Sequence, residues 1–179
     1  MKKVNIFLVD DDEMYLKSSV HNLNQNKGYS VKTFSTGEPA LEAIKKGNVD
    51  VVILDYFLDS EVPGAKSGLE ILKEIKAYKP GLDVIMLSGQ EDVDVALNSM
   101  DFGAFDYVVK NKSSLIRVKN DIKRIIQTKE AQKNHKNYKM YTKFFFGFLI
   151  FLIIFLVVYT LDPTLFGLLG DPEMFDQTK

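Results

Sequence analysis

Short apolar runs alternate with amphipathic stretches along residues 4–127. The runs read VNIFLV, YSVKTF, VVILD, DVIMLS and YVVK, and the stretches between and after them are Met14–Asn26, Glu38–Lys46, Gly68–Tyr78, Asp92–Met100 and Ser113–Gln127. A run such as VVIL is apolar at every position, so as a strand it needs cover on both faces, which helices flanking a parallel sheet provide. The pattern therefore predicts a doubly wound α/β fold with five parallel strands.

A second pattern begins at residue 144, where the sequence reads FFFGFLIFLIIFLVVYTL without a charge up to residue 161. The block is apolar around the whole helical circumference, and its 18 residues span roughly 27 Å, close to the ~30 Å hydrocarbon core of a bilayer. A buried helix in an oligomeric core is the alternative, but a chain of this size has little other surface to cover such a helix on all sides. The block predicts a single transmembrane helix.

The charges on the two sides of this block differ in sign. Residues 129–143 contain five lysines against Glu130, whereas residues 162–179 contain four acidic residues and one lysine. Because positive flanks stay inside, we expect a cell-membrane protein with its N-terminal part in the cytoplasm. The expected organisation is a folded domain over residues 1–128, a basic polar linker over 129–143, the span over 144–161 and a short acidic tail over 162–179.

Overall composition excludes several other classes of protein. Lys and Arg number 23 against 24 Asp and Glu, a formal charge of -1, so there is no global basic field of the kind that attracts nucleic acid. We therefore expect no nucleic-acid partner, and we assign the five linker lysines to anionic lipid headgroups. The chain has no cysteine, which excludes disulfides, thiolate metal sites and thiol chemistry.

The residues that directly follow the apolar runs are mostly charged. The first run ends in the aspartates 10–12, the third in Asp55, the fourth in Ser88 and the fifth in Lys110. In a parallel sheet these positions meet at the carboxyl edge, where ligands bind. A single aspartate there is commonly a helix cap, but two acidic ends with Ser and Lys are more typical of a site.

Carboxylates that converge repel one another unless a cation joins them, and Mg²⁺ prefers carboxylates, water and phosphate oxygens. Such a site favours phosphoryl chemistry. Asp55 would be the nucleophile, Lys110 would balance developing negative charge, and the Ser88 hydroxyl would donate to a phosphoryl oxygen.

The segments FLVDDDE, VVILDYFL, VIMLSG and GAFDYVVK, in this order and spacing, resemble the receiver domain of two-component response regulators. The resemblance covers roughly residues 3–128. It implies a flavodoxin-like sheet with strand order 2-1-3-4-5 and makes Asp55 the phosphoacceptor. By the same resemblance Mg²⁺ is held by Asp10, Asp11, Asp55 and the backbone carbonyl of Phe57.

The resemblance also gives roles to three residues on the last two strands. Ser88 and Lys110 would contact the phosphoryl group. Tyr107 corresponds to the family's switch aromatic, whose ring changes burial as the Ser88 hydroxyl moves. A half-buried strand tyrosine is the alternative interpretation of Tyr107.

Three features depart from the family pattern. Asn111 follows Lys110 where proline is usual, which predicts an altered loop. The segment from Asp55 to Gly68 is about five residues longer than usual, with Asp59 in place of the common proline, which predicts changed access to the site. The usual output domain is replaced by the membrane helix, so transcriptional control is not the expected role.

The sequence therefore predicts a membrane-anchored receiver that accepts phosphate from a sensor histidine kinase or phosphotransfer protein and signals to a downstream protein. It predicts a switch and not an enzyme. One alternative is an adaptor that keeps the fold without phosphorylation. A phosphohydrolase is the other, but Phe57 stands where its general acid is expected.

Overall fold

The computed structural model describes residues 3–58 and 66–161, with the backbone alone for 134–140 and 159–161. Within this part five strands form one parallel sheet: β1 (Val4–Val9), β2 (Tyr29–Phe34), β3 (Val51–Asp55), β4 (Asp83–Ser88) and β5 (Asp106–Val109). Their order is β2-β1-β3-β4-β5, which confirms the predicted topology. Asp59 with most of the lengthened loop, and the acidic tail, lie outside the described residues.

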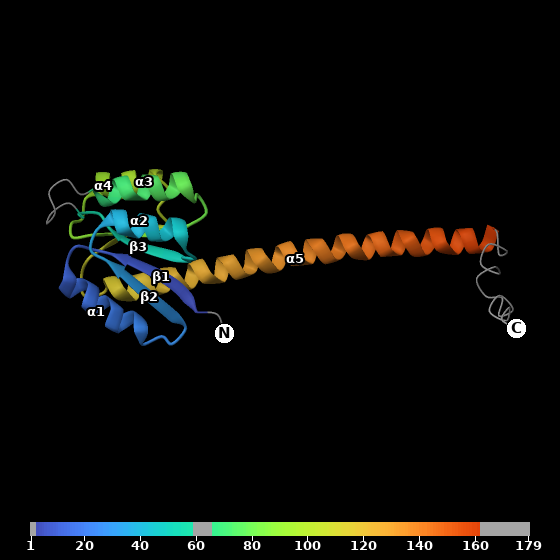
Figure 1. Cartoon of the computed structure of the whole chain (residues 1–179), viewed down its shortest axis with the longest axis horizontal. Coiled ribbons are helices and arrows are strands. Elements are labelled where there is room, and N and C mark those ends of the chain that lie inside the picture. Colours follow the sequence, from blue (N-terminus) through green and yellow to red (C-terminus); the bar gives the residue numbers. More distant parts are fainter. Residues whose placement is uncertain (1–2, 59–65, 162–179) are drawn as a thin grey trace, which may run out of the picture. The chain divides into compact units, whose positions relative to one another are not determined.

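Helices cover both faces of the sheet (Figure 1). They are α1 (Glu13–Asn24), α2 (Gly37–Lys46), α3 (Gly68–Tyr78), α4 (Val93–Asp101) and α5 (Ser114–Leu161). Helices α2, α3 and α4 pack on one face, and α1 with the first part of α5 packs on the other. This is the doubly wound arrangement that the apolar runs predict.

All five residues of the central strand β3 are buried, which explains why the four residues before Asp55 are apolar. Leu54 faces the core that contains Ile71 of α3. Ile53 faces the opposite core, which contains Val118 and Ile122 of α5. A strand that feeds two cores has no position left for a polar side chain until its end, which is where Asp55 lies.

The last helix is longer than predicted. The sequence pattern places its end at Gln127, but α5 continues through residues 129–143 to Leu161. The prediction is wrong because the polar stretch lacks a stop signal: neither glycine nor proline occurs between Ser114 and Gly147. Residues 1–128 and 129–179 form two compact units. Within α5 the window Tyr141–Val158 is long and apolar enough to cross a membrane, and none of it is buried by the described chain.

Candidate functional site

Three carboxylates meet at the carboxyl edge of the sheet. Asp10 and Asp11 follow β1, Asp55 ends β3, and one oxygen of each lies within 4.8 Å of the others. Asp10 is fully buried and Asp55 is 3% exposed. Asp55 Oδ1 is buried and has no hydrogen-bond partner among the described residues. Adjacent strands thus place their terminal carboxylates in one cluster, as the sequence predicts, with Asp10 and Asp55 buried and Asp11 partly exposed.

Lys110 brings the compensating charge. Its Nζ lies 2.7 Å from Asp10 Oδ2 and 3.0 Å from Asp55 Oδ2, and its side chain is 19% exposed. The backbone N–H of Lys110 donates to the carbonyl of Ser88 at 2.7 Å, which fixes the residue at the end of β5. The predicted cation and two of the predicted carboxylates therefore form one buried ion-pair network.

Burial and charge shift the acidity of this network. Burial, with the neighbouring charge of Asp10, raises the pKa of Asp55 to about 6 against the attraction of Lys110. Burial also raises the pKa of Asp10. For Lys110 burial acts in the opposite direction, but the carboxylates of Asp10 and Asp55 outweigh it and raise its pKa. Lys110 is therefore a permanent cation at neutral pH. Its single positive charge does not fully balance the two carboxylates that it faces.

Asp12 has a different role from its two neighbours. Its side chain accepts hydrogen bonds from the backbone N–H groups of Met14 and Tyr15 at 2.8 and 3.0 Å, so it is the N-cap of α1. Its own N–H donates to Asp10 Oδ1 at 3.1 Å. The capped turn holds Asp10 in place, and the helix-cap interpretation is correct for this one aspartate of the three.

Gly68 lets α3 approach the strand that ends in Asp55. Its N–H donates to the carbonyl of Tyr56 at 2.9 Å. A Cβ at this position would lie 1.9 Å from the carbonyl oxygen of Asp55 and 2.8 Å from Tyr56 Cα. Any side chain at residue 68 therefore has to displace either the helix or the strand end that carries Asp55.

We expect Gly68→Ala to lower the free energy of unfolding by about 2 kcal/mol or more, because backbone atoms rather than a flexible side chain must move. Gly81→Ala is the matched control, since a Cβ there meets nothing within 4 Å. It should change stability by less than about 0.5 kcal/mol. Urea unfolding of both variants measures the difference, and equal stability would contradict the close packing of α3 against β3.

Ser88 and Tyr107 are linked through the loop after β4. Leu87 lies beside Asp55 in the sheet register, and Ser88 follows it directly. The Gln90 N–H donates to Ser88 Oγ at 3.3 Å, and the Tyr107 hydroxyl donates to the Gln90 carbonyl at 2.9 Å. Tyr107 is 9% exposed, so its ring is turned inward. Gln90 is a connection that the sequence does not reveal, because the contact uses only its backbone.

Asn111 shapes the loop that the sequence predicts to be altered. Its Oδ1 accepts hydrogen bonds from the N–H and the hydroxyl of Ser113 at 2.9 and 2.8 Å, and its carbonyl accepts from the Ser114 hydroxyl at 2.9 Å. These bonds form a tight turn into α5. Because Lys110 still reaches both carboxylates, the replacement of the usual proline does not displace the cation.

Phe57 is 37% exposed, and its ring meets the Tyr56 ring edge-on with 4.8 Å between centroids. Its proposed contribution to the metal site is its backbone carbonyl, and that role stays a prediction.

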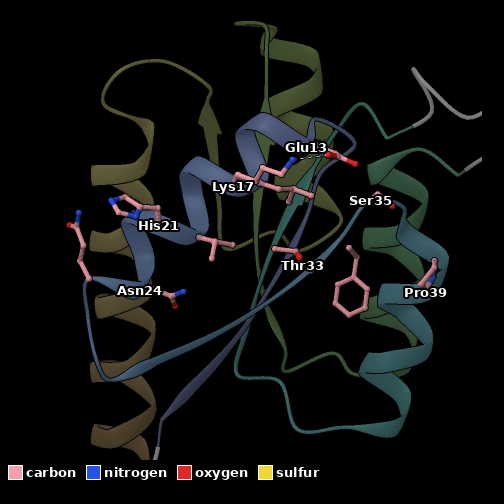
Figure 2. A pocket seen from close by; sticks show the side chains of 11 residues that line it. Glu13, Lys17, His21, Asn24, Thr33, Ser35 and Pro39 are labelled. Atoms are coloured by element: carbon pink, nitrogen blue, oxygen red, sulfur yellow. Dashed lines mark hydrogen bonds and ion pairs between the residues drawn. The ribbon is translucent and has the colours of Figure 1, made fainter.

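A groove of about 1080 Å³ lies beside α1, between this helix, the end of β2 and the start of α2 (Figure 2). Its walls include His21 and an ion pair between Glu13 and Lys17 at 2.9 Å. None of the predicted site residues lines it. This groove is therefore separate from the carboxylate cluster that the sequence predicts as the site.

Comparison with known proteins agrees with this geometry. Residues 6–120 match the family described as response regulator receiver domain. The chain is 32% identical over 108 residues to the transcriptional regulatory protein MalR of Bacillus subtilis, a match that covers 60% of this chain and 44% of MalR. The chain therefore spans less than half the length of this curated relative.

Two solved structures extend the comparison. A response regulator receiver domain protein from Clostridium thermocellum is 30% identical with a TM-score of 0.63, covering 72% of this chain and 98% of that one. The structure described as the BeF3 activated DrrB receiver domain is 35% identical with a TM-score of 0.56, covering 68% and 98%. Both likenesses cover nearly the whole of the solved chain and leave more than a quarter of this one unmatched.

Proposed function

The chain belongs to the response regulator receiver family, and we propose that it is a membrane-anchored switch that accepts a phosphoryl group on Asp55. Receiver domains are signalling switches that interact with histidine kinases or phosphotransfer proteins. The observation that carries the proposal is the buried cluster at the end of β3, where Asp55 keeps one oxygen without a partner beside two further carboxylates and the Lys110 ammonium.

Receiver domains bind Mg²⁺ at an acidic pocket, and the residues present here fit that ion. The cluster offers only hard oxygen donors, and Asp55 Oδ1 is a buried acceptor without a partner among the described residues. Asp10, Asp11, Asp55 and the Phe57 carbonyl would hold the ion. When bound, Mg²⁺ would shield the negative charge that the carboxylates and an incoming phosphoryl group share.

The residues of this chain supply the remaining parts of the transfer. A carboxylate oxygen of Asp55 forms a bond to phosphorus while the bond from phosphorus to the donor's histidine nitrogen breaks, and the nitrogen leaves with that electron pair. Lys110 moves from the carboxylates to a phosphoryl oxygen and balances its charge. The Ser88 hydroxyl donates to another phosphoryl oxygen.

The readout we propose runs from Ser88 to Tyr107. If the Ser88 hydroxyl turns toward the phosphoryl group, it gives up the hydrogen bond that it accepts from Gln90. The Gln90 carbonyl also holds the Tyr107 hydroxyl, so a shift of this loop changes the position of the ring. The exposed surface near β5 would then differ between the two states, and a downstream protein would read the difference.

The proposed location is the cell membrane, crossed once by the C-terminal part of α5 with the receiver on the cytoplasmic side. The apolar window Tyr141–Val158 and the five lysines before it support this proposal. The absence of a nucleic-acid partner stays a prediction, because the relative MalR carries the description of a transcriptional regulator and only its receiver part is matched.

Beryllofluoride, a phosphoryl analogue, tests the proposal on the full chain in detergent micelles. Fluorine NMR should show a saturable protein-bound signal that needs both beryllofluoride and Mg²⁺ and that disappears when a chelator removes the metal. A wild-type chain that remains folded but gives no bound signal would support the phosphorylation-independent adaptor instead. The position of Lys110 on both carboxylates favours the switch.

A further inference from the structure

Lys110 contacts an aromatic ring as well as the two carboxylates. Its Nζ lies over the ring of Tyr15, 4.7 Å from the centroid, while the same nitrogen lies 2.7 Å from Asp10 Oδ2 and 3.0 Å from Asp55 Oδ2. The face of an aromatic ring attracts a cation, and the attraction grows when water is excluded. At this site the lysine side chain is 19% exposed. The ammonium thus lies between two carboxylates and a ring face.

The fold anchors the backbone of Tyr15 and buries its hydroxyl. Its backbone N–H donates to the Asp12 side chain that caps α1, so the residue stands in the first turn of that helix. Its hydroxyl is buried next to the side chains of Ser19 and Ser114, which belong to α1 and to the start of α5, and has no hydrogen-bond partner among the described residues. The ring therefore bridges two helices and has little freedom to follow a moving partner.

We propose that Tyr15 is a positioning residue for phosphoryl binding, whose ring face guides the Lys110 ammonium between the carboxylates and the phosphoryl group. This inference rests on the proposed function. A lysine side chain has several rotatable bonds and loses rotamer freedom when it is fixed. When Asp55 becomes an acyl phosphate, its oxygen no longer carries the carboxylate charge that held the ammonium, and the negative charge lies on the phosphoryl oxygens instead. A fixed ring face beside the site keeps it within reach of the new phosphoryl oxygens.

The alternative is that Tyr15 is an ordinary core residue, since it also packs against the cluster of α1, α5 and the sheet. Substitutions separate the two roles. Tyr15→Phe keeps the ring face, whereas Tyr15→Leu keeps apolar bulk and removes it. Tyr29→Leu is the matched control, because Tyr29 packs against the same cluster but opens β2 at the opposite, amino edge of the sheet.

The first measurement is the beryllofluoride affinity of the full chain at fixed Mg²⁺. Tyr15→Leu should weaken it by about fivefold, within the range expected of a largely desolvated cation–π contact. Tyr15→Phe and Tyr29→Leu should stay within about twofold of wild type. In a chain that already carries Lys110→Met, the further change Tyr15→Leu should have almost no effect, because the cation is gone. An equal loss in that background would overturn the inference in favour of a structural role.

The second measurement needs no phosphoryl analogue. In the free protein the Tyr15 ring should shift the terminal methylene proton signals of Lys110 upfield in an NMR spectrum. The shift should persist in Tyr15→Phe and vanish in Tyr15→Leu. Its absence from wild type would overturn the ring contact while leaving Asp55 as phosphoacceptor intact. A normal ring shift with no beryllofluoride binding would instead refute the proposed function, and the positioning role would fall with it.

Discussion

Replacing Asp55 by asparagine is expected to reduce phosphoryl labelling of this protein to background. Asparagine keeps the size and position of the side chain at the end of β3 but has no carboxylate oxygen that can attack phosphorus. Incubation with labelled acetyl phosphate and Mg²⁺ measures the effect without the need for a cognate kinase. Asp12→Asn is the matched control, because it removes the same charge two residues from Asp10 while asparagine caps a helix as well as aspartate does.

Asp55→Asn should be more stable than wild type when Mg²⁺ is absent. The pKa of Asp55 is about 6 instead of 3.8, so protonation favours the folded state, and this contribution is lost as the pH rises from about 4 through 6. At pH 7 the wild type holds an ionised buried carboxylate at a cost of up to about 3 kcal/mol, at roughly 1.4 kcal/mol per pKa unit. Asp55→Asn removes that cost, so unfolding cannot explain a loss of labelling.

Labelling of Asp55→Asn at the wild-type level would refute the assignment of the phosphoacceptor. The adaptor would then be the better description of this protein. If neither wild type nor Asp55→Asn is labelled although both are folded, the adaptor is again the better description. Loss of labelling in Asp12→Asn as well would show that labelling also depends on the turn into α1, and the loss in Asp55→Asn would then no longer identify the phosphoacceptor.

The strand ends could be predicted from the sequence because a parallel sheet brings the residues after its apolar runs to one edge. That rule places Asp10, Asp55 and Lys110 together before any distance is known. At the first strand end the rule does not show which of the aspartates 10–12 belong to the site and which one caps the helix, because all three are the same residue type. Only the hydrogen bonds of the turn show that Asp12 caps the helix.

Other contributions have no signal in a single sequence. Gly68 looks like an ordinary helix start in the sequence. It matters because a Cβ at this position would lie 1.9 Å from the carbonyl oxygen of Asp55. Tyr15 lies in the first turn of α1, and nothing in its spacing connects it with Lys110, 95 positions later in the chain. Contacts of this kind depend on how the helices pack against the sheet and against one another. An apolar pattern shows only which face of an element is buried, not which residues that face meets.

The end of α5 shows the opposite limitation. Hydrophobic periodicity stops after Ile125, so the pattern predicts the end of a packed helix and not the end of a helical backbone. Residues 129–143 are rich in lysine and outside the periodic pattern, yet they contain no proline or glycine and remain helical in the structure. The periodic part therefore defines the receiver core, while the length of the helix is decided by the absence of a breaker.

We expect the full chain to fractionate with membranes and to stay there in alkaline carbonate. The window Tyr141–Val158 carries no buried residue within the described chain, and its apolar side chains have to be covered by lipid or by another protein. Carbonate releases proteins that are held by charge or by protein contacts and leaves spanning helices in place. A fragment ending at Gln127 should remain in the supernatant with its receiver folded.

A pair of substitutions gives this prediction its sharpest test. Leu149→Arg with Ile153→Arg places two charges near the centre of the window, each of which costs about 2.5 to 3.5 kcal/mol on insertion scales. That variant should lose carbonate resistance, whereas Leu149→Ala with Ile153→Ala should keep it.

Protease added outside intact cells should remove an epitope fused after Lys179 of the wild-type chain and leave the receiver whole. Release of wild type by carbonate would refute the membrane anchor. Digestion of the receiver from outside would refute the orientation that the five lysines predict.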